Sequence, residues 1–288
     1  MNPFPRIWFV GLLAVCLALP GKLLADDADS ERQTKLLKTF VSEFVSITPG
    51  EGQFPATFEM GSNDGPPNER PAHQVKITRS FAIAKYEVPQ NLYEAVMGSN
   101  PSRWKGPRNS VEMLTWDEAI EFCKKTTELA RTLKLIEADD IIRLPTEAEW
   151  EYCCRAGTTT RYSFGGEAQR PNDISPKAKL LDVYAWHTGN AAGNDPPVGA
   201  LKPNPWGLYD IHGYLWEFTA DAWTDDYSNA APDGSASKPG PDTKSMVIRS
   251  GSWKDDFTKL TSSCRRPLAR SAKDDAVGFR CVMSKAAD

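Results

Sequence analysis

The most reactive side chains in this sequence are its cysteines. One of the six lies in an apolar N-terminal run, and five follow it, at Cys123, Cys153, Cys154, Cys264 and Cys281. Thiolates bind soft metals such as Cu(I), and thiols form disulfides or exchange with a substrate thiol. Because five is an odd number, at least one thiol stays free or pairs outside the chain.

Histidines are few and scattered. His73, His187 and His212 lie far apart in the sequence, which argues against a redox metal site built from several imidazoles. No histidine lies near the acidic pair Asp255-Asp256 or the basic pair Arg265-Arg266 to form a nucleophilic triad. We interpret both pairs as parts of a solvated loop.

The N-terminus has the pattern of a secretion signal. Arg6 gives a positive flank, residues 7–20 are almost entirely apolar, and Ala25 is a small residue suited to cleavage. We expect a signal peptide over residues 1–25 and a secreted or periplasmic protein without membrane attachment after cleavage. An uncleaved anchor is the alternative. Lipidation at Cys16 is a weaker one, because the apolar run continues past it.

Composition and charge are those of an ordinary globular protein. The 288 residues are 25% charged and 40% hydrophobic, and the net charge is -4 with no basic block. We therefore expect no nucleic-acid partner. Residues 26–45 form a charged, then amphipathic segment, interpreted as a short helix packed on the main domain or as a spacer. A single domain follows over residues 46–285.

The elements of this domain are short. Strands are predicted near residues 58–61, 73–77 and 81–88. Capping boxes predict two main helices, one beginning at Thr115-Trp-Asp-Glu118 and one at Thr146-Glu-Ala-Glu149. No long helical period follows residue 157, and the Asp-, Ser-, Gly- and Pro-rich residues 224–245 predict a surface loop. The pattern is that of an α+β fold rich in loops.

Several runs, taken together and in order, resemble the formylglycine-generating-enzyme, or sulfatase-modifying-factor, family. They are Phe58–Ser62, Tyr86–Val88, Asn100–Ser102, Arg143–Tyr152, Arg155–Gly157, Asn204–Ile211, Gly213–Glu217, Arg249–Trp253 and Gly278–Arg280. The resemblance covers nearly the whole chain after the signal. It implies a single α+β domain of the formylglycine-generating-enzyme type, which is C-type-lectin-like.

These runs also have a local physical interpretation. Besides the helix caps, they contain aromatic residues suited to a core and arginines that can pair with buried carboxylates. We expect Arg143 and Arg280 to be bidentate partners of carboxylates such as Glu147 or Glu217. The shared pattern is thus mostly scaffold, and a scaffold does not fix a function.

The resemblance implies an activity that this chain is not equipped for. Active members oxidise a cysteine of a sulfatase to formylglycine with copper and oxygen, using two thiols near the C-terminus. The corresponding positions here fall near Asp255 and Ser262, and Cys264 is the one cysteine between Trp253 and Arg270. No catalytic residue is therefore assigned with confidence, and copper is not expected.

Disulfides and calcium are also implied by the resemblance. Cys123 with Cys281, and Cys154 with Cys264, match two family bridges, with Cys153 left over or exchanging with Cys154. One structural calcium site would use Asn190 and Ala191, with Asp195 as a guess for its acidic ligand. The other would use the carbonyls of a turn and one carboxylate, from His212, Gly213, Leu215 and Glu217. The alternative for Glu217 is a simple pair with an arginine.

Three functions remain open on this basis. The chain is first interpreted as an exported, non-oxidase binding or structural member of the family, with a peptide, protein or glycan as its ligand. It is alternatively a divergent formylglycine-generating oxidase with different metal ligands. A third possibility is an accessory subunit of an active relative, for which the extra Cys153 is a weak indication.

Overall fold

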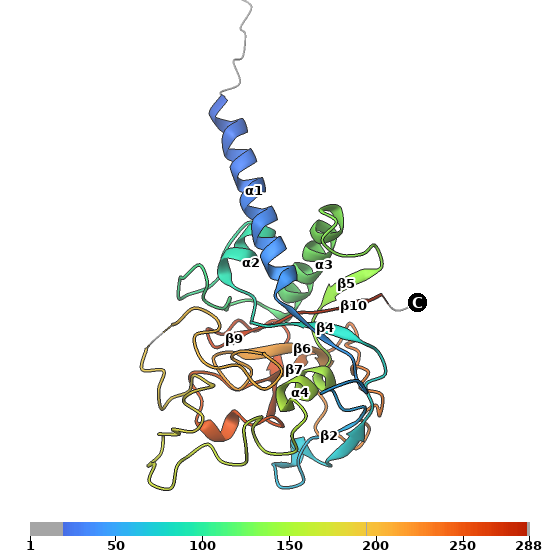
Figure 1. Ribbon diagram of the computed structural model, residues 1–288, viewed down its shortest axis with the longest axis vertical. Helices are drawn as coiled ribbons and strands as arrows, with labels where there is room; N and C mark the ends of the chain where they lie inside the picture. The colour runs from blue at the N-terminus through green and yellow to red at the C-terminus, as the bar shows by residue number, and fades with distance from the viewer. Residues whose placement is uncertain (1–19, 194, 287–288) are drawn as a thin grey trace, which may run out of the picture.

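The computed structural model describes residues 20–193 and 195–286. Most of the expected signal peptide, residues 1–19, lies outside these residues, and residues 20–25 begin the first helix, α1 (Pro20–Ser42). Figure 1 shows α1 standing away from the body of the protein, with its C-terminal end against it. Within the described parts of the chain, no helix has the length and apolar character needed to cross a membrane.

Both predicted capping boxes are confirmed. In α3 (Trp116–Thr132), Thr115 Oγ1 accepts from Glu118 N at 3.2 Å, and Glu118 Oε2 accepts from Thr115 N at 2.7 Å. Thr146 and Glu149 make the same reciprocal bonds at the start of α4 (Glu147–Arg155). These bonds satisfy amides that a helix otherwise leaves unpaired at its N-terminus.

Two helices differ from expectation. A short helix was expected before the domain, but α1 has 23 residues and buries Leu37 and Phe40 in the main core. α2 (Gln90–Met97) was not anticipated. It has no side-chain cap, follows Pro89 directly, and ends at Gly98, whose φ of 82° suits glycine. It is only 8 residues long, too short for a clear periodic signal.

Three small sheets complete the fold. One has the order β1-β4-β10-β5, the second pairs β2 with β3, and the third has the order β8-β7-β6-β9. Their strands are β1 (Phe44–Ile47), β2 (Phe58–Met60), β3 (His73–Val75), β4 (Phe81–Ala84), β5 (Asp140–Arg143), β6 (Trp216–Ala222), β7 (Ser245–Arg249), β8 (Arg265–Ala269), β9 (Val277–Gly278) and β10 (Val282–Lys285). Pairing is antiparallel except between β6 and β9. Loops occupy much of the lower half of Figure 1.

The core lies on both sides of the first sheet. One cluster joins α1, α2 and α3 to β6 and β7, and includes Trp216 and Phe279. The other joins α4 to β2, β3 and the 206–211 turn around Trp150. Trp150 and Tyr152 were expected to supply core area, and their exposures of 0% and 1% confirm it.

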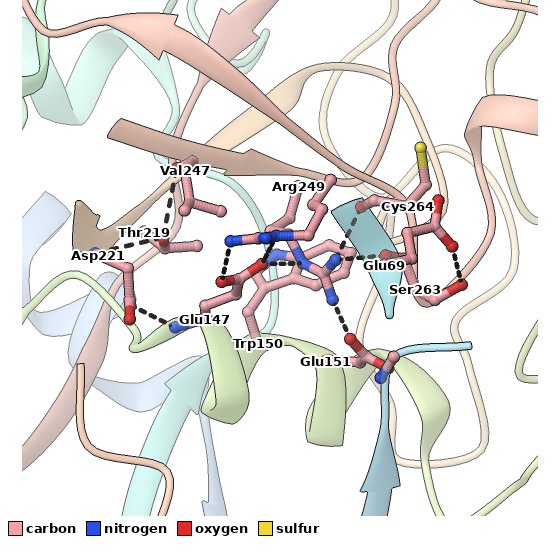
Figure 2. A network of polar contacts seen from close by, with 12 residues as sticks. Glu69, Glu147, Trp150, Glu151, Thr219, Asp221, Val247, Arg249, Ser263 and Cys264 are labelled. Atoms are coloured by element: carbon pink, nitrogen blue, oxygen red, sulfur yellow. Dashed lines mark hydrogen bonds and ion pairs between the residues drawn. The ribbon is translucent and has the colours of Figure 1, made fainter. Parts of the chain in front are cut away.

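A buried network of ions ties α4 to β7 and β8. Glu151 and Arg249 are fully buried and form an ion pair. One turn earlier on the same helix, the Glu147 carboxylate accepts two hydrogen bonds from the Arg265 guanidinium, at 2.7 and 3.0 Å. Figure 2 shows Arg249 lying between these carboxylates and the segment that contains Ser263 and Cys264. Burial alone would raise the pKa of Glu151, but Arg155 and Arg249 outweigh it, and the pKa is lowered.

The other predicted arginine pairs are partly correct. Arg280 forms a fully buried bidentate pair with Glu217, with both contacts at 2.7 Å, as expected. Arg143 instead pairs with Glu149, also with two contacts of 2.7 Å. Glu149 was not among the carboxylates named as examples; it turns back toward the start of α4 as its capping residue and so meets Arg143 there.

We predict that Glu151→Gln destabilises the protein by about 3 kcal/mol or more, because it leaves Arg249 buried with its closest counter-charge removed. The measurement is urea unfolding at neutral pH. The matched control is Glu121→Gln, which removes an exposed i,i+4 contact to Lys125 and should leave stability unchanged within error. Equal stability of the two variants would contradict a structural role for the buried pair.

Candidate functional site

Asp255, near which the resemblance places the first family thiol, is a bracing carboxylate. Asp255 Oδ2 accepts from Trp216 Nε1 at 2.7 Å, from the amide of Ser252 at 3.0 Å and from the Ser252 hydroxyl. Its carbonyl accepts from Thr188 N at 3.0 Å. Asp255 therefore holds the loop after β7 against β6. The interpretation of this residue as part of a solvated loop was wrong.

Ser262, near which the resemblance places the second family thiol, is buried. Ser262 has no exposed surface, and its amide donates to Arg161 O at 2.8 Å. Arg249 donates to the carbonyls of Ser262, Ser263 and Cys264 at 2.7 to 3.0 Å. Arg265, which follows this segment, is also buried against Glu147, so the basic pair is not a solvated feature either.

The described thiols are buried, and four of them have raised pKa values. All five described cysteines are free and buried. Burial raises the pKa of Cys154 and Cys264 to about 12 and raises those of Cys153 and Cys281 well above the usual value. At neutral pH these side chains are thiols, whereas nucleophilic attack and metal binding need thiolates.

The two predicted disulfides remain predictions. Cys123 Sγ and Cys281 Sγ lie 3.8 Å apart, between α3 and the residue before β10. Cys154 Sγ lies 3.6 Å from Nδ1 of His212. Burial lowers the pKa of His212 to about 4, so the ring is neutral. Its Nε2 accepts from Ser163 N at 3.0 Å, which leaves the proton on Nδ1, donated to Leu260 O at 3.0 Å.

The side chains expected to bind calcium are engaged within the protein. Both oxygens of Glu217 are taken by Arg280, and Oε2 also accepts from Trp150 Nε1 at 2.9 Å. His212, Gly213 and Leu215 lie in the turn that leads into β6. A calcium ion beside Glu217 would face a buried guanidinium, so this set does not fit the ion.

The other set is similarly engaged. Asn190 Oδ1 accepts from His187 N at 2.9 Å, and its amide donates to Ala185 O, so it closes the local turn that contains Ala191. Asp195 accepts from Tyr214 OH at 2.7 Å and from Asn109 Nδ2 at 2.6 Å. Across residues 20–193 and 195–286, no cluster of three or more His, Cys, Asp or Glu side chains is arranged to hold a metal ion.

We predict that chelation leaves the thermal stability unchanged, because Arg280 supplies the positive charge that calcium would bring to Glu217. The measurement is Tm in excess EDTA and in excess CaCl2, at equal ionic strength. A higher Tm in calcium, absent with the same concentration of magnesium, would contradict this expectation and support the calcium sites inferred from the resemblance.

The candidate functional site is a cleft between loops. It lies next to the loop braced by Asp255 and is lined by Trp104, Ser110, Glu112, Tyr214, Trp253 and Asp275. These residues come from the loop after α2, the segment before α3, the turn into β6, the loop after β7 and the residues before β9. Tyr214 has a φ of 125°, a sparsely populated conformation for a non-glycine residue and a kind of strain often found at functional sites.

The rim of the cleft combines tryptophan with fixed cations. Arg103 lies over the ring of Trp104 at 4.8 Å, and Lys254 lies over the ring of Trp253 at 5.0 Å. Both cations form ion pairs with Asp275, and Arg103 does so at 3.2 Å. Asp275 thus pairs with both of the cations that lie over the two tryptophan rings.

The interior of the cleft contains oxygen atoms without partners. Glu112 and Ser110 have exposures of only 3% and 2%. Glu112 Oε1 accepts from Trp104 N at 2.9 Å. Glu112 Oε2 and Ser110 Oγ have no hydrogen-bond partner among the described residues. Unpaired buried polar atoms are costly, and their place in a cleft indicates a site for a ligand.

A second, larger cavity lies beside α4 and is less suited to a ligand. It has a volume of about 290 Å3 and includes Glu147, Asp221 and Tyr227 in its lining. Its deep groups are paired within the protein: Glu147 with Arg265 and Tyr227, and Asp221 with the amides of Glu147 and Ser237. These groups have no unpaired side-chain oxygen, although His73 Nε2, which also lines this cavity, has no hydrogen-bond partner in the described structure.

The cleft was not found from the sequence. The six residues named above belong to five separate segments with no shared spacing, so periodicity carries no signal for them. The resemblance pointed to Trp253 and named Asp195 and Leu215, which also line the cleft, only as candidate calcium ligands. It assigned no role to Glu112, Trp104 or Asp275. The run Asn100-Pro-Ser102 was one indirect signal, because Asn100 Oδ1 accepts from Ser102 N at 3.0 Å and shapes the turn that presents Trp104.

The family can now be assigned. A profile of the sulfatase-modifying factor enzyme 1-like domain matches residues 30–285. The chain belongs to this family. The solved structure of PvdO from Pseudomonas aeruginosa is similar with a TM-score of 0.67 and 27% identity, over 80% of this chain and 92% of that one. The expected fold of the formylglycine-generating-enzyme type, which is C-type-lectin-like, is confirmed.

Two curated relatives have different names. Chaperone protein LppX of Paenibacillus barcinonensis is 31% identical over 175 residues, covering 48% of this chain and 62% of the relative. The formylglycine-generating enzyme of Bos taurus is 29% identical over 226 residues, covering 73% of this chain and 54% of the relative. The matched part of this chain therefore spans less than two thirds of either relative.

Proposed function

We propose that this protein is an exported binding member of the family that does not oxidise cysteine. The proposal rests on the structural contacts of Asp255 and Ser262, the residues near which the family thiols are expected. One carboxylate oxygen of Asp255 accepts from three donors and holds its loop in place. Ser262 is fully buried, and its carbonyl accepts from Arg249. Restoring a thiol pair would require both the side chains and the surrounding contacts to change.

The ligand we favour is a polypeptide. The cleft has aromatic walls on two loops and an unsatisfied carboxylate oxygen at its base, features suited to holding one side chain of an extended chain. Similarity to a relative named as a chaperone agrees with a fold that holds another polypeptide. A glycan would use the same tryptophan faces, so it is an outcome that the binding experiment must distinguish.

The other two functions have less support. A divergent oxidase needs a metal or redox site of its own, and within the described residues no cluster of three or more His, Cys, Asp or Glu side chains supports one. An accessory subunit linked through Cys153 needs that thiol to be accessible, but its exposure is 0%.

We predict that the copper-loaded protein forms no aldehyde on a Cys-x-Pro-x-Arg peptide under oxygen, because no thiol pair is available to bind copper or engage the substrate. Mass spectrometry of the peptide is the measurement, with an active formylglycine-generating enzyme as positive control. Conversion of the peptide would contradict the proposal. Faster conversion only when this protein is mixed with the control enzyme would favour the accessory function.

The binding side of the proposal is tested by selection from a displayed random peptide library and by a glycan array. Peptides should be recovered, and Trp253→Ala should weaken their binding at least tenfold through loss of one aromatic wall. Tyr184→Ala, on a loop remote in sequence, is the control. Recovery of glycans alone would favour a lectin-like role, and recovery of no ligand would contradict the proposal.

A further inference from the structure

The orphaned oxygens of the cleft are held in place by their own segment. Glu112 N donates to Ser102 Oγ at 3.1 Å, and Glu112 Oε1 accepts from the amide of Trp104. The carboxyl group is therefore fixed at its backbone and at one oxygen. Its other oxygen, Oε2, is left without a partner in the described structure, in the same cleft as the unpaired Ser110 Oγ.

The room beside these atoms is small. The space open to water in the cleft is about 70 Å3, which corresponds to about two water molecules. A whole sugar ring or an aromatic side chain would require the walls to move. The end of a narrow aliphatic chain that carries a hydrogen-bond donor fits without such a change.

The charges around this space favour a cation. Asp275 and Asp195 both act on Glu112 as like charges. Burial raises the pKa of Glu87 well above its usual value, so this neighbour, which lies within reach of the Ser110 hydroxyl, is neutral and adds no charge. The two nearby cations, Arg103 and Lys254, are committed to Asp275 and to the tryptophan faces. An anion would be repelled, whereas a neutral group would leave the Glu112 carboxylate buried without a counter-charge.

We propose that Glu112 Oε2 and Ser110 Oγ form a subsite for the protonated primary amine of a ligand, presented on an aliphatic stem as in a lysine side chain. Trp104 and Trp253 are positioned to pack on the stem, and the ammonium donates to the two orphaned oxygens. This inference rests on the proposed binding function and names the chemistry that the cleft recognises.

The subsite has a built-in dependence on pH. Burial, together with Asp275 and Asp195, raises the pKa of Glu112 to about 7, against the lowering effect of the Trp104 and Arg103 amides. Asp195 is held by Tyr214 and Asn109, and the cations Arg103 and Lys254 face Asp275.

An ammonium binds the carboxylate form of Glu112. Between pH 6 and pH 8 the ionised fraction rises from about one tenth to about nine tenths, so affinity should rise about tenfold. The amine itself, with a usual pKa of about 10.4, stays charged throughout this range.

The test uses the full mature chain and Nα-acetyl-lysine N-methylamide as the probe, titrated by NMR at pH 6, 7 and 8. The matched probe is Nα-acetyl-norleucine N-methylamide, which keeps the stem and lacks the amine. We expect the lysine probe to bind more tightly by about tenfold at pH 8 than at pH 6, and the norleucine probe to bind weakly with no pH dependence. Equal binding of the two probes would overturn the proposal.

Glu112→Gln keeps the shape of the side chain and removes its charge. This variant should lose at least tenfold in affinity for the lysine probe at pH 8 and lose the pH dependence, while Glu121→Gln, exposed on α3, should behave as the wild type. Wild-type binding by Glu112→Gln would contradict the subsite. If selected peptides without lysine bind in a Trp253-dependent manner, the binding function stands and the amine subsite alone is wrong.

Discussion

Two carboxylates one turn apart on α4, Glu147 and Glu151, determine how the C-terminal half of the protein is arranged. Buried carboxylates are tolerated when each has a cationic partner, and here the partners are Arg265 and Arg249 from the two ends of the segment between β7 and β8. Arg249 has donors left over, and it uses them on three successive carbonyls at residues 262–264. The ion pairs thus fix the backbone where active relatives are expected to hold a thiol.

This arrangement separates the scaffold from the chemistry. The buried pairs, the capping boxes and the Arg280–Glu217 pair all stabilise the same fold, whatever lies in the loops. Asp255, near the expected position of one thiol, ties the loop after β7 to Trp216. Trp253 belongs to the same loop and lines the cleft next to Asp255. Family membership therefore identifies the framework, while the side chains of the loops decide what the framework binds.

The local features of the fold could be predicted from sequence, and the tertiary ones only in part. Capping boxes involve residues three apart, so the starts of α3 and α4 were correctly predicted. The pair Arg280–Glu217 was expected because both residues lie in family runs. Arg143 was expected to pair with a carboxylate, but its partner Glu149 was not named, since glutamates two residues apart on α4 cannot be distinguished without the direction of each side chain.

Prediction failed where burial depends on distant segments. Arg265 and Asp255 were interpreted as solvated because charged residues in a loop usually are, yet α4 and β6 supply partners from far away in the chain. No sequence pattern pointed to Glu112, because what distinguishes this residue is a carboxylate oxygen that has no hydrogen-bond partner in the described structure. The central claim, that the segment between Trp253 and Arg270 offers no site for a soft metal, is tested most directly by titrating the fully reduced Cys123→Ser variant, in which the thiol pair with Cys281 is removed, with Cu(I) against a chromogenic chelator. The account predicts no stoichiometric high-affinity binding at neutral pH; tight one-to-one binding would contradict it.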